Sequence, residues 1–113
     1  LRVLSLNCRQ QPEVLKSLLN ETSPDDVGVM CVRELPKFIA TSPSFRSPKW
    51  HLFLPSTAGQ CDRTSWPRST IYLNVHIPSD SYAQLRIASW DLVGISFSLH
   101  SQTFTIYSVY NPP

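Results

Sequence analysis

Short apolar runs open this chain, and a helical pattern separates the first two. Residues 1–6 are mostly apolar and residues 27–32 almost entirely so, which predicts two strands, the second buried on both faces. Between them, apolar residues recur at helical spacing from position 14 to 19, directly after Pro12, and proline favours the first position of a helix. The order strand, helix, strand predicts a βαβ unit with a parallel, right-handed strand pair.

The second half of the chain alternates apolar and polar residues with a period of two. Three segments show this alternation and are rich in β-branched and aromatic side chains: 71–77, 93–99 and 104–109. This pattern predicts three strands of an antiparallel meander, with residues 100–102 closing the last two as a hairpin. Prolines interrupt residues 36–68, so we expect a long irregular connection with one short strand at 50–54. The fold class is therefore α/β.

Composition limits the size and kind of this protein. With 113 residues, 42% hydrophobic content and 16% charged content, residues 1–113 suit one small globular domain. The net charge of +2 is too small to indicate nucleic acid by itself, and no apolar run is long enough to span a membrane.

The cysteines and the ends of the chain give two further expectations. The three cysteines, Cys8, Cys31 and Cys61, are odd in number and lack zinc-ligand spacing, which favours a reducing, intracellular compartment. The chain begins and ends beside predicted strands, and its only methionine is Met30. We expect it to be part of a longer reading frame, a single truncated domain.

Two polar residues follow the two strands of the predicted parallel pair. Asn7 follows the first strand, and Glu34 follows the second after Arg33. Sites in α/β sheets form outside the carboxyl ends of such strands. Glu34 is a candidate ligand for magnesium, which prefers one or two carboxylates with water and phosphate. Asn7 is a candidate to bind a phosphate oxygen or to hold the Glu34 carboxylate. The alternatives are a solvated loop glutamate and a turn asparagine.

A third polar pair closes the last predicted strand. Tyr110 and Asn111 can donate a hydroxyl and an amide hydrogen to a phosphate, and Arg9, two residues after Asn7, can bind the same anion. Each of the three also fits an ordinary surface position, and alone that interpretation is favoured.

The remaining chemistry-bearing residues point less clearly to function. The three histidines have no partner at ligand spacing and are expected to face outward: His51, His76 and His100. The three tryptophans can stack on bases, but we expect them to anchor irregular segments to the core: Trp50, Trp66 and Trp90. Asp91, before a strand, is expected to cap a turn.

In order along the chain, four segments resemble the motifs of the endonuclease/exonuclease/phosphatase superfamily: 4–9, 25–34, 68–73 and 106–112. The likeness is greatest to the apurinic-type endonuclease domain that opens the second reading frame of non-LTR retrotransposons, particularly fungal ones. The resemblance implies a two-sheet α/β sandwich, truncated after its first half. It further implies magnesium- or manganese-dependent cleavage of DNA phosphodiesters and a nuclear location.

The resemblance also assigns roles to residues. Glu34 would be the metal ligand, Asn7 the amide beside the metal and the scissile phosphate, and Tyr110 a contact of that phosphate. Asn111 would bind phosphate beside it. Two departures stand out: Arg33 replaces the family's glutamine, and Leu35 replaces its proline. An arginine at the metal site would compete with the cation unless it turned outward.

Two of the family's motifs have no counterpart here. The Gly-Asp-x-Asn motif and the terminal Asp-His pair, which would activate water and supply the acid–base histidine, are absent from the 113 residues. We therefore expect the isolated chain not to cleave DNA. Two alternatives stay open: a non-catalytic nucleic-acid-binding or interaction relic, and an inositol-phosphate or sphingolipid phosphodiesterase. Unpaired strand edges also predict self-association.

Overall fold

The computed structural model describes residues 1–56 and 66–111, so Cys61 and the final two prolines lie outside the described residues. The elements are β1 (Val3–Asn7), α1 (Pro12–Glu21), β2 (Val29–Arg33), β3 (Trp50–Phe53), β4 (Ser69–Asn74), β5 (Tyr82–Gln84), β6 (Leu92–Leu99) and β7 (Gln102–Val109), with short 3₁₀ turns at Pro43–Phe45 and Ser79–Ser81. Among the described residues, no helix is long and apolar enough to cross a membrane.

The first sheet has four strands in the order β1-β2-β4-β3. β1 and β2 are parallel, with Val3 opposite Val29 and Asn7 opposite Arg33, so the predicted parallel unit is confirmed. α1 connects them and begins at Pro12, the first helical position, as the sequence predicts. Its apolar face buries Leu15 and Leu19 against the sheet.

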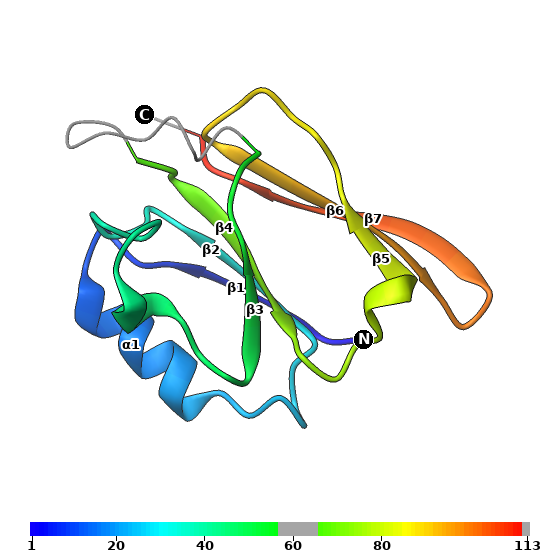
Figure 1. Cartoon of the computed structure of the whole chain (residues 1–113). Coiled ribbons are helices and arrows are strands. Elements are labelled where there is room, and N and C mark those ends of the chain that lie inside the picture. The colour runs from blue at the N-terminus through cyan, green and yellow to red at the C-terminus, as the bar shows by residue number, and fades with distance from the viewer. Residues whose placement is uncertain (57–65, 112–113) are drawn as a thin grey trace.

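The second sheet has three strands, β5-β6-β7, and covers the other face of the first sheet (Figure 1). β6 and β7 form the predicted hairpin. Its turn residues, His100 and Ser101, both have positive φ angles of 51° and 64°, the geometry that matches the twist of a two-residue hairpin.

The prediction of one three-stranded meander is wrong. β4 lies in the first sheet, antiparallel to both β2 and β3, and β6 pairs with β5 and β7 in the second sheet. All six residues of β4 are buried, because α1 and residues 35–50 cover one face and the second sheet covers the other. Period-two alternation therefore does not mark an exposed face here. The three-residue strand β5 gave no signal in the sequence.

Two apolar layers hold the sandwich together. One lies between the first sheet and α1, and contains Met30, Val32 and Tyr72. The other lies between the sheets, and contains Val29 and Ile71. β2 and β4 supply both layers because successive strand residues point to opposite faces. This arrangement is a two-sheet α/β sandwich, as expected.

The second sheet does not cover the whole inner face of the first. Val3, Ser5 and Asn7 point to that face from β1 and are exposed, whereas Val29 and Cys31 on β2 are buried. The uncovered strip along β1 is open to solvent, and it leads to the carboxyl ends of the strands.

Candidate functional site

The loops that follow β1 and β2 are joined by backbone hydrogen bonds. The Cys8 amide donates to the Arg33 carbonyl at 2.9 Å, and the Gln10 amide donates to the Glu34 carbonyl at 2.8 Å. Together with the pairing of Asn7 with Arg33, these bonds hold the two loops side by side. The structure therefore brings Asn7 and Glu34 to the same sheet edge.

Both loops contain residues with left-handed backbone. Arg9 and Gln10 have φ angles of 50° and 61°, and Glu34 has a φ angle of 51°. None is glycine, and such conformations cost on the order of 1–3 kcal/mol each. Strain of this kind is concentrated at functional sites more often than elsewhere. The loop hydrogen bonds described above compensate for part of this cost.

The side chains of Asn7 and Glu34 have different surroundings. The Asn7 Oδ1 accepts the Arg9 backbone N–H at 2.9 Å, which fixes the amide beside the loop and leaves its NH₂ group for another acceptor. Glu34 is half-buried, and among the described residues its carboxylate forms no ion pair. Within the described part of the chain, the Asn7 NH₂ group and the Glu34 carboxylate therefore have no hydrogen bond or ion pair that would exclude a ligand.

The donor set permits one carboxylate ligand to a metal. Magnesium keeps several waters and takes one or two carboxylates with substrate phosphate, so Glu34 fits that role. No group of three or more acidic, histidine or cysteine side chains that could hold a metal ion occurs in the described residues. A tight, fully protein-ligated metal site is therefore not found in residues 1–56 and 66–111.

A second polar group lies where β7 ends, near the starts of β4 and β6. The Tyr110 amide donates to the Asp91 carbonyl at 2.8 Å. The Arg68 guanidinium lies 5.8 Å from the centre of the Tyr110 ring and 3.9 Å from the Asp91 carboxylate. Asp91 thus pairs with an arginine, and the turn cap expected of its side chain stays a prediction. The Arg68 cation over the ring is a stabilising arrangement.

The carboxyl ends of β1, β2 and β7 lie at one end of the molecule (Figure 1). Of the residues predicted from the sequence, Asn7 is the last residue of β1, and the others follow the three strands: Arg9, Glu34, Tyr110 and Asn111. Arg9 and Asn111 are exposed there. Arg68 also lies at this end, because β4 is antiparallel to β2 and begins where β2 ends. Arg68 was not among the site residues predicted from the sequence.

Arg33, the last residue of β2, lies beside this region and does not turn outward from the sandwich. It lies opposite Asn7 on one side and Ser69 on the other, so the three side chains share the inner face of the sheet. Its Nη1 donates to the Ser5 hydroxyl at 2.5 Å. Arginine therefore stands on the inner face opposite Asn7, where its charge would compete with a bound cation.

A buried hydroxyl pair joins the two sheets close to Arg33. The Ser69 hydroxyl donates to the Ser108 hydroxyl at 2.7 Å, and both residues are buried. Ser108 also hydrogen-bonds to the Cys31 thiol; burial raises the pKa of Cys31, and the Arg33 charge and the Ser108 bond oppose that rise. The pair connects β4 to the carboxyl end of β7 and so fixes the position from which Tyr110 projects.

The other residues considered from sequence lie outside this region or in the core. All three histidines are exposed: His51, His76 and His100. Trp50 is buried, and the Trp66 indole N–H donates to the Leu35 carbonyl at 3.0 Å. Trp66 thus anchors an irregular segment to the core, as expected, whereas Trp50 begins β3 and is part of the core itself.

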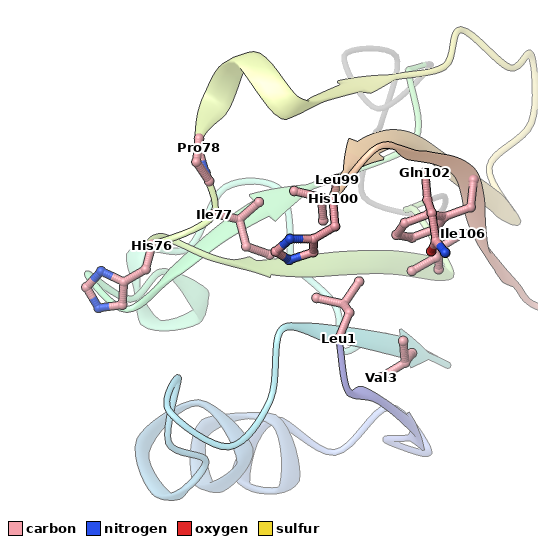
Figure 2. A pocket seen from close by; sticks show the side chains of 10 residues that line it. Leu1, Val3, His76, Ile77, Pro78, Leu99, His100, Gln102 and Ile106 are labelled. Carbon is pink, nitrogen blue, oxygen red and sulfur yellow. The ribbon is translucent and has the colours of Figure 1, made fainter.

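At the opposite end of the sandwich lies an apolar hollow of about 690 Å³ between the start of β1 and the β6–β7 turn (Figure 2). Figure 2 shows Leu1 and Val3 on one side of it, facing residues of the hairpin and of the segment after β4. None of the site residues predicted from the sequence lines it. The polar end and the apolar end of the sandwich are thus separate.

Comparison with known proteins supports the architecture. No protein-family model matches the chain, and no curated protein matches it. Among solved structures, the fold is similar to the "Endonuclease domain of TRAS1, a telomere-specific non-LTR retrotransposon", with a TM-score of 0.69 and 13% sequence identity. The match covers 98% of this chain and 44% of that one. At this identity the likeness establishes the fold, which is that of an endonuclease-type α/β sandwich. The chain spans less than half of the solved domain.

Proposed function

We propose that this chain is the amino-terminal half of a divalent-metal-dependent phosphodiesterase domain, of the DNA endonuclease kind and of retroelement origin. Its fold matches a retrotransposon endonuclease domain over 98% of its own length and 44% of that domain. On this proposal the isolated chain does not cleave DNA, because the residues that would activate water and protonate the leaving group belong to the other half.

The observation that carries the proposal is the convergence of three strand ends. β1 and β2 deliver Asn7 and Glu34 to one sheet edge through paired loops. β7 ends at the same end of the sandwich and delivers Tyr110. In the proposed site Glu34 binds Mg²⁺ or Mn²⁺, which when bound would act as a Lewis acid toward a phosphodiester. Asn7 and Tyr110 contact the phosphate in this site. Arg9 and Asn111, which are both exposed, bind phosphate oxygens beside them.

Manganese titration followed by NMR tests the metal site directly. Bound Mn²⁺ broadens the signals of nuclei close to it, so the amide signals of Asn7 and Glu34 are expected to disappear first. Glu34→Gln removes the negative charge at nearly constant size and is expected to abolish this selective broadening. Glu13→Gln, an exposed glutamate on α1, is the matched control and is expected to leave it unchanged.

Two results would contradict the proposal. Broadening that persists in Glu34→Gln would place the metal elsewhere. Robust Mg²⁺-dependent nicking of supercoiled plasmid by the purified wild-type chain, lost in Glu34→Ala, would show that the 113 residues are a complete enzyme.

A second candidate function is a nucleic-acid-binding module that has lost the chemistry. Arg33 favours it, because a cation on the inner face beside Asn7 weakens the attraction of a metal to Glu34. For this candidate, Mn²⁺ would leave the spectrum unchanged, while DNA binding would persist and weaken steeply with salt.

A further inference from the structure

We infer that Arg33 forms an anion site with Asn7 on the uncovered inner face of β1, and that this site binds one phosphodiester group of a nucleic acid without a divalent cation. The inference rests on the proposed function in one respect, since it takes the same class of ligand. It differs in the group that provides the positive charge, which is a guanidinium and not a metal.

The first argument is the charge of Arg33, for which the described residues supply no counterion. The residue is half-buried, and none of the carboxylates in the described ranges 1–56 and 66–111 forms an ion pair with it. Its one side-chain hydrogen bond in that part of the chain goes to a neutral acceptor, the Ser5 hydroxyl. A partly desolvated charge without an opposite charge is unfavourable. A bound anion would relieve that cost.

The second argument is the geometry of the donors. A guanidinium carries five N–H groups in a planar fork, and the bond to Ser5 uses one nitrogen. That bond draws the side chain along β1 and fixes its direction. The remaining N–H groups lie on the same face as the NH₂ group of Asn7, the residue paired with Arg33 in register, and both kinds of donor suit phosphate oxygens. Asn7 itself is held by its bond to the Arg9 amide.

The third argument is access and the balance of charge around the site. Ser5 and Asn7 are exposed because the second sheet stops short of β1, so a phosphate can reach the inner face beside them. Among the described residues at the ends of these strands are three arginines, Arg9, Arg33 and Arg68. The described carboxylates that follow β2 and precede β6 there are Glu34 and Asp91. Among these five residues positive charge exceeds negative charge, which attracts the backbone of a nucleic acid.

Fluorescence anisotropy with a short fluorescein-labelled DNA duplex, in EDTA, tests the inference on the whole 113-residue chain. Arg33→Gln is expected to weaken binding roughly tenfold or more, the size of one charged hydrogen bond. It is also expected to lower the slope of log K against log salt by about 1, the value for one lost phosphate contact. Arg33→Lys is expected to recover part of the affinity.

Arg2→Gln is the matched control, because it makes the same change of charge at the other end of β1, on an exposed residue. Thermal unfolding by circular dichroism is measured for every variant. If Arg33→Gln fails to fold, the Arg33→Lys comparison decides, since lysine keeps the charge but loses the planar fork. Competition by inorganic phosphate at equal ionic strength would show that the ligand is the phosphate group itself, whether free or in DNA.

The outcomes separate this inference from the proposed function. Equal affinities and salt slopes for Arg33→Gln and Arg2→Gln would overturn the inference, even if Glu34 binds manganese. Binding seen only with Mg²⁺ and lost in Glu34→Gln would also overturn it and leave the proposed function standing. A specific loss in Arg33→Gln with no manganese binding at Glu34 would support the inference and contradict the proposed function.

Discussion

Replacing Ser108 with alanine is expected to destabilise the sandwich at the junction of its two sheets. Ser108 accepts the Ser69 hydroxyl at 2.7 Å, and both residues are at most 1% exposed. Without the acceptor, the Ser69 O–H is left buried and unpaired, which costs about 1–3 kcal/mol. That is a substantial part of the roughly 5–15 kcal/mol by which a domain is stable.

Urea denaturation measures this loss. For a slope of about 2 kcal/mol per molar, typical of a small domain, a loss of about 2 kcal/mol lowers the midpoint by roughly 1 M. Ser98→Ala is the control, because Ser98 is exposed on β6 and the same substitution there leaves no buried donor. Amide exchange adds a local readout: the Tyr110 N–H, bonded to the Asp91 carbonyl, is expected to exchange faster in Ser108→Ala.

The double variant Ser69→Ala/Ser108→Ala tests whether the loss of stability comes from an unpaired Ser69 hydroxyl. Removing both hydroxyls leaves no unpaired donor, so the double variant is expected to be no less stable than Ser108→Ala, and the two changes to couple by about 1 kcal/mol or more. A double variant that loses the sum of the two single losses would show that the hydroxyls act independently. An unchanged midpoint in Ser108→Ala would show that water or Cys31 satisfies Ser69.

Two further predictions concern the strand edges and the buried thiol. Val3 and Tyr107 are 51% and 52% exposed on the edge strands β1 and β7, so the chain is expected to self-associate. Val3→Lys should make it more monomeric in sedimentation velocity, and a wild type that is monomeric at all concentrations would contradict this. Burial raises the pKa of Cys8 from 9.0 to about 11, so the unfolded chain releases this proton first. Stability should therefore fall as pH rises from 9.0 to about 11. Across that pH range the urea midpoint should fall less for Cys8→Ala than for the wild type. Equal falls would show that the Cys8 thiol is not the cause.

Local patterns determined the elements that carry the candidate site. Helical spacing after Pro12 and the apolar run before Arg33 were enough to predict α1 and β2. They also predicted that β2 is parallel to β1. From the carboxyl-end rule for such sheets, Asn7 and Glu34 followed as neighbours, and the structure places both at the ends of the paired strands β1 and β2. Their roles as phosphate contact and metal ligand stay predictions.

Strand pairing across the chain was decided only by tertiary structure. Alternation within β4 resembles that of β6 and β7, and a period of two does not say which sheet a strand joins or whether both its faces are covered. The pairing of β4 with β2 is what brings Arg68 and Ser69 to the site.

The direction of Arg33 is the other feature that sequence left open. Alternation along β2 puts Arg33 on the same face as Val29 and Cys31. The sequence does not say that this face lies between the two sheets, or that the guanidinium donates to Ser5, which lies 28 positions away along the chain. The sequence by itself thus determined which residues reach the edge of the sheet, because short-range spacing controls strand and helix formation. Only the tertiary structure decided which charges meet there, because that depends on contacts between residues far apart in the chain.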